Sequence, residues 1–339
     1  MSTEFKSIGE FYGAAARAVR GGRTDPRLVR DALLGGSSTS GQDGAFMVPL
    51  KIAADLLELT YEQSVLAKRC HRFPAAEKAD TFAPSINEES RVDGSRFGGV
   101  GSGWIGQGEA IPTGTPKWKR WDAGHLKKVG AVVYASEELV EDAPLLTENL
   151  NTILPAELSY RMDQAIVRGN GVQSMLGVLD APATIEVSKE TGQAADTICV
   201  ENVLGMLNRL DARSYASAAW LINMECWAQL YMMAQVVGAG GVPVFSLTDT
   251  TLCGRPVIPV EQCATVGTVG DIVLADLSQY AIIEKPLKAV VSAHVAFTSN
   301  QVCFRTVFRC DGQPIWDSPV TPANGAATVS PFIVLESRD

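Results

Sequence analysis

Residues 144–171 are PLLTENLNTILPAELSYRMDQAIVRGNG, and this stretch predicts the longest helix of the chain. Its apolar residues recur at steps of three and four, as on one face of a helix: Leu146, Leu150, Ile153, Leu154, Leu158, Met162, Ala165 and Ile166. Gly169-Asn170-Gly171 ends the pattern, because glycine and asparagine terminate helices. Pro155 removes one backbone donor, so we expect either a kink near Asn151 or a tolerated bend.

The segment before this helix, Pro74–Pro116, has the opposite character. Glycine, proline and charged residues dominate it, and its apolar residues stand alone: Phe82, Ile86, Val100, Trp104 and Ile111. A long segment without secondary structure is rare inside a compact domain, so we expect an extension that serves the function. The alternation within Trp118–Tyr134 predicts a strand that returns from a long hairpin.

The first 44 residues predict an arm on a flexible linker. Apolar residues at helical spacing predict a helix from Phe5 to Val19, and Asp25-Pro26 has the N-cap and first-turn residues of a second, short helix. The run Ser37–Gly44 is polar and glycine-rich, and it cannot bury enough apolar surface to order itself. Beyond it, Ile52–Leu59 predicts a short helix that leads into a strand.

The part of the chain after the long helix alternates between the two patterns. Val200–Leu210 and Met224–Met233 predict helices. The predicted strands are Ala219–Ile222, Ile272–Leu274, Tyr280–Ile283, Ala289–Phe308 and Ile333–Leu335. Leu252–Val257 predicts a turn into a strand, and Asp311-Gly312 predicts a hairpin turn. Regular βαβ alternation and internal repeats are absent from the sequence, so the predicted class is mixed α+β.

Composition excludes several classes of protein. Of the 339 residues, 29 are Lys or Arg and 38 are Asp or Glu, which gives a net charge of −9 and argues against a nucleic-acid coat or a membrane-surface binder. An apolar share of 46% excludes disorder as the main state. The charge-free stretch Cys226–Leu247 contains Gly238 and Pro243 and cannot span a bilayer as one helix. No signal peptide is present, so we expect a cytoplasmic product.

Cysteine and histidine spacing gives no sign of a metal or disulfide framework. The seven cysteines are scattered without a C-x-x-C pair, and we expect them to be reduced, buried and inert. The three histidines lie far apart in the sequence. We therefore expect no metal ion and no cofactor.

The sequence predicts no catalytic residues. Gly101–Gly106 matches the G-x-G-x-x-G string of dinucleotide-binding proteins, but Gly108 and Pro112 follow it and prevent the helix that such a site needs. Paired carboxylates occur at Glu88-Glu89, Glu137-Glu138 and Glu141-Asp142. Their positions in a loop and at a helix start favour solvated side chains over acid–base catalysis. We therefore do not expect an enzyme.

One basic cluster leaves two interpretations open. It contains two tryptophans among its cations: Lys117, Trp118, Lys119, Arg120, Trp121, Lys127 and Lys128. Such a cluster is typical either of a charged hairpin flank or of a surface that stacks on bases and contacts phosphates. The net acidic charge of the chain favours the hairpin flank.

Several separated strings occur in an order that resembles one family. They are Gly44–Pro49, Trp104 with Glu109, Ala135–Asp142, Asp163–Gly171, Gly177–Leu179, Ala219–Asn223, Leu252–Val257, Gly270-Asp271, Ala275-Asp276, Tyr280, Phe304-Arg305 and Arg309–Gly312. In this order they resemble the major capsid proteins of tailed double-stranded DNA bacteriophages, which have the Hong Kong 97-type fold. The resemblance spans residues 44–315.

The resemblance implies a division of the chain into four parts. It implies an N-terminal arm with a flexible linker at 1–60 and an extended loop, a long β-hairpin, at 74–125. It further implies a peripheral domain with a long spine helix and a β-sheet at 126–190 and 300–339, and a mixed α/β axial domain at 191–299. Arms and loops of this kind suit a subunit that must reach its neighbours in a closed lattice.

The implied function is structural. The chain is expected to self-assemble into hexamers and pentamers of an icosahedral shell around double-stranded DNA, without sequence-specific binding. The expected partners are further copies of the chain, a scaffolding protein, a portal, a capsid maturation protease and a decoration protein. The expected location is the virion capsid, with the host cytoplasm during assembly. A cellular encapsulating nanocompartment or a gene-transfer particle built from the same fold is the alternative.

Two features of the wider family lack a counterpart in this sequence. Many relatives carry a helical scaffolding segment before the folded body, whereas only 44 residues precede it here. Some relatives weld subunits through a lysine and an asparagine, but Lys117, Lys119 and Asn324 stand in no matching motif. The remaining rivals are an enzyme with a site assembled from distant residues and a nucleic-acid-binding module that uses Lys117–Lys128.

Overall fold

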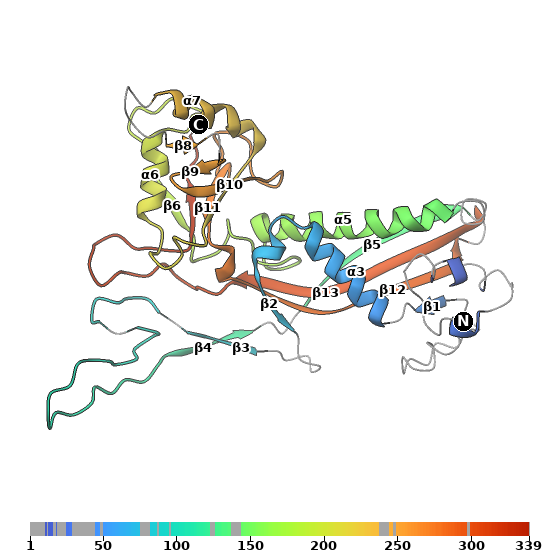
Figure 1. Cartoon of the computed structure of the whole chain (residues 1–339), viewed down its shortest axis with the longest axis horizontal. Helices are drawn as coiled ribbons and strands as arrows, with labels where there is room; N and C mark the ends of the chain where they lie inside the picture. Colours follow the sequence, from blue (N-terminus) through green and yellow to red (C-terminus); the bar gives the residue numbers. More distant parts are fainter. Residues whose placement is uncertain are drawn as a thin grey trace. The chain divides into compact units, whose positions relative to one another are not determined.

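The computed structural model describes residues 11, 13–15, 18, 25–28, 45–47, 50–74, 82–86, 88–94, 96–122, 126–136, 144–236, 244–246, 249–296 and 299–338 (Figure 1). The chain divides into two compact units. The first comprises Met1–Lys68, Leu126–Asp163 and Ile283–Cys310, and the second comprises Arg69–His125, Gln164–Ile282 and Asp311–Asp339. No helix among the described residues is long and apolar enough to cross a membrane.

A long antiparallel sheet forms the first unit. Its strands lie in the order β1 (Ala45–Met47), β12 (Tyr280–Ala296), β13 (Gln301–Pro314) and β5 (Lys127–Ser136). The pairing of β13 with β5 runs from Gln301 opposite Ser136 to Cys310 opposite Lys127. Exposure alternates along β5 and, apart from the buried Cys303, along β13 from Gln301 to Cys310, because successive side chains of a strand point to opposite faces. One face of this sheet is therefore covered and the other is open.

The helix α3 (Leu50–Gln63) is held at its end by a buried carboxylate. Asp163 lies in the long helix α5 (Pro144–Arg168) and accepts hydrogen bonds from the Ser64 hydroxyl at 2.5 Å and the Val65 amide at 2.9 Å. It also accepts from the amides of Leu66 and Ala67 at the start of the short 3₁₀ helix η2 (Ala67–Arg69). Capping free amides by an anion is favourable, so Asp163 ties the chain after α3 to α5.

The predicted long helix is present as α5, and Pro155 lies in its interior without ending it. The helix therefore tolerates the proline, and the predicted choice between a kink near Asn151 and a bend stays a prediction. Just beyond α5, the amide of Val178 donates to the Ile166 carbonyl and that of Leu179 donates to the Val167 carbonyl. A Cβ on Gly177 would overlap the Gly169 amide, so glycine is required where these backbones cross.

A mixed sheet forms the core of the second unit. Its strands follow one another in the order β6 (Ile185–Val187), β14 (Phe332–Leu335), β11 (Ile272–Ala275), β7 (Ala219–Ile222), β10 (Arg255–Pro259), β9 (Thr251–Leu252) and β8 (Phe245–Ser246). Every residue of the three inner strands β14, β11 and β7 is buried. Continuous apolar strands are typical of a sheet covered on both faces.

Two helices cover one face of this sheet, α6 (Val200–Asn208) and α7 (Trp227–Val236). Val203 and Met206 of α6 and Leu230 of α7 belong to the same apolar cluster as Trp220 of β7. The Trp220 indole donates to the Leu252 carbonyl at 3.0 Å, so its polar atom is satisfied in the core. The mixed α+β class predicted from the sequence is confirmed.

The remaining elements are short. They are β2 (His71–Pro74), β3 (Phe82–Ile86), β4 (Trp118–Asp122), η3 (Met224–Cys226) and η4 (Leu277–Gln279). Helical residues occur among the described positions of the N-terminal part, at 11, 13–15, 18 and 26–28. The rest of the two predicted N-terminal helices and the predicted linker Ser37–Gly44 lie outside the described residues.

The predicted hairpin turn at Asp311-Gly312 is wrong, because β13 continues through both residues to Pro314. The Asp311 carboxylate accepts from the Gly312 amide at 2.9 Å, and the Gly312 carbonyl accepts from the Leu176 amide at 2.8 Å. A Cβ on Gly312 would lie 2.8 Å from the Met175 sulfur and 2.9 Å from the Tyr280 ring. The glycine here permits close packing rather than a turn.

Candidate functional site: the extended loop and its anchor

The segment between β3 and β4 forms a long, narrow loop (Figure 1). The two strands pair antiparallel, from Phe82 opposite Asp122 to Ile86 opposite Trp118. Further out, the Lys117 amide donates to the Gly98 carbonyl at 3.0 Å. A long hairpin is therefore present, and its returning strand is β4. The alternating residues that predicted a returning strand lie instead in β5, which pairs with β13. We call residues 88–117 the extended loop.

Glycine lets the two sides of the extended loop approach each other. A Cβ on Gly114 would overlap the Gly99 carbonyl oxygen, and one on Gly101 would lie 3.2 Å from the Thr113 carbonyl carbon. At the tip, the Gly106 amide donates to the Glu109 carboxylate at 2.9 Å. No helix follows Gly101–Gly106 in the described stretch up to residue 117. These glycines thus serve backbone packing, and the geometry of a dinucleotide site is absent from this stretch.

The tip of the extended loop exposes large apolar side chains. Every residue from Ser102 to Thr115 is exposed, with Trp104 at 104% and Ile111 at 71% of their reference areas. Ile105 lies between them in the sequence and is also exposed. Exposed aromatic and aliphatic side chains gathered in one segment are typical of a surface that contacts another macromolecule.

The base of the extended loop is fixed by a cluster of ion pairs, which we call the anchor. Arg91 donates to Glu88 at 2.9 Å and to Asp211 at 2.9 Å. Asp211 follows α6 and also accepts from Arg213 at 2.9 Å. The guanidinium carbons of Arg91 and Arg213 lie 5.7 Å and 5.6 Å from the centroid of the Trp316 ring. The anchor thus joins three segments that are distant in sequence.

Backbone hydrogen bonds strengthen the same junction. The Arg91 amide donates to the Thr321 carbonyl at 2.8 Å, and the Thr321 amide donates to the Glu89 carbonyl at 3.0 Å. Ser90 and Thr321 form a parallel bridge. The first turn of the extended loop is therefore bound to the segment that follows β13, by main chain as well as side chain.

The anchor shifts the acidity of its own groups. Burial acts to raise the pKa of Asp211, but the hydrogen bonds and charges of Arg91 and Arg213 outweigh burial and hold that pKa below its ordinary value of 3.8. Burial acts to lower the pKa of Arg91, and its bonds to Glu88 and Asp211 raise it above its ordinary value. Asp211 and Arg91 are therefore charged near neutral pH and form a structural ion pair.

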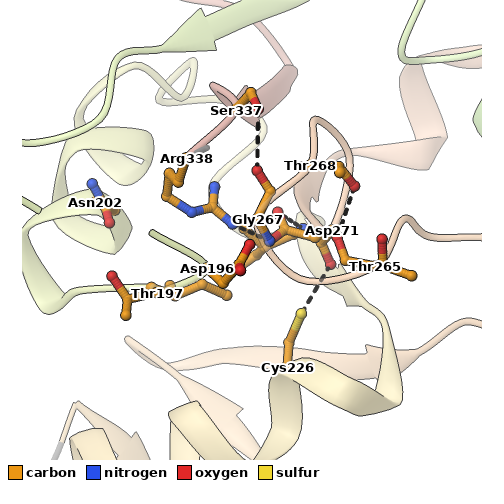
Figure 2. A network of polar contacts seen from close by, with 12 residues as sticks. Asp196, Thr197, Asn202, Cys226, Thr265, Gly267, Thr268, Asp271, Ser337 and Arg338 are labelled. Carbon is orange, nitrogen blue, oxygen red and sulfur yellow. Dashed lines mark hydrogen bonds and ion pairs between the residues drawn. The ribbon is translucent and has the colours of Figure 1, made fainter. Parts of the chain in front are cut away.

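A second polar network lies in the sheet core of the second unit (Figure 2). The fully buried side chains of Arg338 and Asp271 form an ion pair. Asp271 also accepts from the amides of Gly267 at 3.1 Å and Ile272 at 2.7 Å, while the Arg338 amide donates to the Gly267 carbonyl at 2.7 Å. We call this set the core network. It closes the loop before β11 onto the chain that follows β14.

The titratable groups of the core network do not have the properties of catalysts. Burial raises the pKa of Asp271, with Arg338 acting in the opposite direction. Burial also raises the pKa of the Cys226 and Cys263 thiols to about 12, so both thiols are protonated and poor nucleophiles. The Cys226 thiol instead contacts the Asp271 carbonyl at 3.7 Å. The arrangement stabilises the fold and offers no reacting pair.

The carboxylates and cysteines that the sequence offered as candidates do not gather at one site among the described residues. Glu88 belongs to the anchor and Glu89 is exposed, while Glu137, Glu138, Glu141 and Asp142 lie outside the described residues. All seven cysteines are unbridged; five are buried, as expected from the sequence, whereas Cys199 and Cys253 are half-buried. Among the described residues, no three His, Cys, Asp or Glu side chains gather as metal ligands would.

The basic cluster of the sequence is divided by the structure. Lys117 ends the extended loop and Lys119 and Arg120 lie in β4, in the second unit, whereas Lys127 and Lys128 lie in β5, in the first unit. Arg309 of β13 stands opposite Lys128. The cations that are neighbours in the sequence are therefore divided between the two units, and Lys128 lies beside Arg309 in the sheet of the first unit.

The family-like strings of the sequence have structural roles in this chain. Asp163 caps the chain after α3, and Gly169 and Gly177 permit a backbone crossing. Cys253 and Gly254, with φ of 49° and 74°, form the tight turn between β9 and β10. The sequence analysis missed the anchor and the core network, because Arg91 and Asp211 are 120 residues apart and no local pattern joins them.

Comparison with known proteins places these features in a class. The model of the phage capsid family matches residues 44–325, which include most of both units and the whole extended loop. The capsid polyprotein of Pseudomonas phage PAJU2 is 26% identical over 268 residues, which make up 74% of this chain and 38% of the polyprotein. The chain thus spans about two fifths of the length of that curated relative.

Solved capsids share the fold. The capsid of an empty GTA particle covers 82% of this chain and 90% of its own length, with a TM-score of 0.60 and 18% identity. A chain from Mycobacterium phage Adephagia covers 80% of this chain and 89% of its own, at a TM-score of 0.54 and 16% identity. The chain belongs to the phage capsid family.

Proposed function

We propose that the chain is a major capsid subunit, a structural protein that assembles into hexamers and pentamers of an icosahedral shell around double-stranded DNA. The match of the phage capsid family over residues 44–325 is the observation that carries this proposal. The buried core network and the structural ion pairs of the anchor also support a non-enzymatic role, since both stabilise the fold. A shell subunit needs contact surfaces and not a reaction centre.

The proposal assigns the parts of the chain to roles in the shell. Residues 1–60 serve as an N-terminal arm with its linker, and residues 74–125, which comprise the extended loop and its flanking strands β3 and β4, serve as the long hairpin that reaches neighbouring subunits. Residues 126–190 and 300–339 form the peripheral domain with α5 as its spine, and residues 191–299 form the axial domain at the centre of each capsomer. The helices α6 and α7 with the strands β7 to β11 lie within 191–299 and support the axial assignment, while β6 and β14 of the same sheet come from the stretches assigned to the peripheral domain.

The extended loop is proposed to contact neighbouring subunits through its tip. Its exposed Trp104, Ile105 and Ile111 support this role, because a free subunit leaves them in water. In an isolated subunit we expect the tip to exchange its backbone hydrogens fast, and in the shell we expect protection. Slow exchange over residues 102–115 of an isolated monomer would contradict the expectation.

We further propose that assembly uses other proteins besides the subunit. The procapsid of satellite phage P4, whose structure includes a size determination protein, has a chain with a TM-score of 0.54 to this one at 13% identity. By analogy, a scaffolding protein, a portal, a maturation protease and a decoration protein are the proposed partners. The proposed locations are the host cytoplasm during assembly and the virion capsid afterwards.

A gene-transfer particle is the second candidate, because the capsid of an empty GTA particle is among the similar structures. A cellular nanocompartment built from the same fold is the third. The content of purified particles separates the three. A single viral genome supports a phage head, mixed host fragments support a gene-transfer particle, and an enclosed enzyme without DNA supports a nanocompartment.

Negative-stain electron microscopy of the expressed 36.2 kDa chain, paired with light scattering for mass, tests the shell proposal. Rings of five or six subunits, or closed shells, are the expected result. The measurement is repeated with co-expressed scaffolding protein. A monodisperse monomer or dimer in both preparations, or saturable enzymatic turnover by the free subunit, would overturn the proposal.

A further inference from the structure

The open face of the first unit's sheet is basic. Along β5 the exposed positions are Lys128, Gly130, Val132, Tyr134 and Ser136, which alternate with more buried residues. The residues opposite them on β13 share this face, and they are Arg309, Val307, Arg305, Cys303 and Gln301. Arg305, Arg309 and Lys128 are exposed, and none of these ten positions is acidic. We call this surface the basic sheet face.

Apolar side chains lie within the basic sheet face. Val132 and Tyr134 are 50% and 53% exposed. Val132 stands opposite Arg305, and Tyr134 stands opposite Cys303. A surface that mixes arginine, tyrosine and valine has the composition of a protein–protein interface, since tyrosine and arginine are enriched at such interfaces.

The exposed side of α3, in the same unit, has the opposite charge. Asp55, Glu58, Leu59 and Glu62 are exposed and recur at helical spacing, while Leu56, Leu57, Thr60 and Tyr61 on the other side are buried. Val65, just beyond the helix, is exposed as well. We call Asp55, Glu58, Leu59, Glu62 and Val65 the acidic helix face.

Neither face has an ionic partner within the described parts of the chain. No described residue forms an ion pair with Asp55, Glu58 or Glu62, and none forms one with Lys128, Arg305 or Arg309. Each face therefore presents three unpaired charges of one sign beside two exposed apolar side chains.

The two faces also match in length. Seven residues of helix separate Asp55 from Glu62, which is about 10 Å at 1.5 Å per residue. Four residues of strand separate Arg305 from Arg309, which is about 13 Å at 3.3 Å per residue. One helix laid on the sheet would therefore bring its carboxylates within reach of both arginines, with Leu59 and Val65 near Val132 and Tyr134.

We propose that the acidic helix face of one copy of this chain docks on the basic sheet face of another copy. The contact is heterologous, because each copy contributes a different face to each of its two neighbours, and contacts of this kind generate rings and lattices. The inference rests on the proposed shell function and deepens it by naming a contact between subunits. A nucleic acid is a poorer occupant, since it would leave Val132 and Tyr134 without apolar partners and would not explain the acidic helix face.

Charge reversal in two variants tests the docking. The helix variant is D55K/E58K/E62K, and the sheet variant is K128E/R305E/R309E. The combined variant carries all six changes and has the same net charge as the original chain. Assembly is measured as the fraction of protein in rings or shells by sedimentation velocity, and folding is checked for each variant by near-UV circular dichroism and thermal unfolding.

Each single-face variant is expected to raise the concentration needed for assembly at least tenfold, because like charges then face each other. The combined variant is expected to recover most of the loss, since its faces are again complementary with their signs exchanged. The two single-face variants, when mixed, are expected to assemble together at a concentration at which neither assembles alone. Assembly of the original chain is expected to weaken as salt is raised.

A control variant separates the docking from the effect of total charge. E186K/E190K/E261K changes exposed positions of the second unit and shifts the net charge as the helix variant does. Unchanged assembly of the control is expected, and an equal loss in the control would overturn the proposal. So would normal assembly of both single-face variants, or a combined variant that is folded and fails to recover.

The outcome of this test differs from failure of the shell function itself. If the original chain forms no assembly with or without scaffolding protein, the proposed function fails before any variant is compared. If the original chain assembles and only the sheet variant fails, with loss of binding to duplex DNA, the basic sheet face serves a polyanion. That result overturns the docking and leaves the shell function in place.

Discussion

The core network and the extended loop belong to the same unit, yet their contacts lie in different places. In the core network a fully buried arginine has its partner carboxylate, Asp271, inside the same chain. In the extended loop every side chain from Ser102 to Thr115 is exposed, and the ordered contacts lie at its base. The comparison indicates that the core network finds its polar partners inside the chain, whereas the loop tip exposes its apolar side chains, as its proposed contact with neighbouring subunits requires.

The largest expected effect is at Arg338. The substitution Arg338→Ala leaves Asp271 buried without its cation, and we expect unfolding to become easier by about 3–5 kcal/mol. Urea denaturation of the isolated subunit measures this loss. Arg161→Ala is the matched control, because Arg161 forms an exposed pair with Glu157. Equal losses for the two variants would contradict the assignment of the core network as the internal support.

A smaller effect is expected at the anchor, which fixes the base of the extended loop. Arg91→Ala removes three charge-assisted hydrogen bonds, two to Glu88 and one to Asp211, as well as the contact with Trp316, and we expect a loss of about 1–3 kcal/mol. Hydrogen exchange should accelerate over residues 88–94 and at Thr321. Arg91→Lys keeps the charge but lacks the planar guanidinium that donates to both carboxylates, so we expect this variant to lose less stability than Arg91→Ala but more than none. Unchanged exchange in Arg91→Ala would show that backbone bonds alone hold the loop base.

The anchor also predicts a response to acid. The pKa of Asp211 is below its ordinary value of 3.8 in the fold, so its contribution to stability is complete above 3.8 and is lost as the pH falls through the lower, folded pKa. The urea midpoint should therefore decrease in that acidic range. In Asp211→Asn the decrease should be shallower, since the titrating group is gone. An identical slope in both proteins would assign the acid sensitivity to other carboxylates.

The smallest effect on stability is expected at the loop tip. Trp104→Ala should leave the urea midpoint of the isolated subunit unchanged, because the side chain is fully exposed and has no intrachain packing to lose. The same variant should assemble less well than the original chain in the sedimentation assay, since the tip then lacks its largest apolar contact. A clear loss of subunit stability would show that the tip packs on its own chain, and the comparison would fail.

The elements that could be predicted from the sequence are those whose apolar residues recur at a regular spacing. The long apolar stripe of α5 and the buried strands β7, β11 and β14 follow from the spacing of neighbouring residues. The full length of β12 was not predicted, since Lys285 and Pro286 interrupt its apolar pattern between Tyr280 and Ala296. Gly312 gives the opposite kind of error. Asp311-Gly312 has the residue types of a turn and predicted a hairpin, but the glycine is needed there for close packing within a strand.

The functional surfaces likewise include one part that the sequence predicts and others that it does not. The extended loop was predicted from its composition, because a long glycine-rich and proline-rich segment has a local signature. The anchor was not, since Glu88, Asp211 and Trp316 meet only through the fold. The basic sheet face was missed for the same reason: Lys128 and Arg309 stand opposite each other across two strands and are far apart in sequence.

The two units alternate along the chain, and this alternation restricts how the gene can recombine. The chain passes from one unit to the other after residues 68, 125, 163, 282 and 310. A single genetic crossover anywhere between codons 69 and 310 would therefore build both units from two parents at once. Exchange of one unit as a cassette would need several simultaneous breakpoints. We expect recombination among related genomes to transfer this stretch of the gene as a block, with viable junctions near its ends.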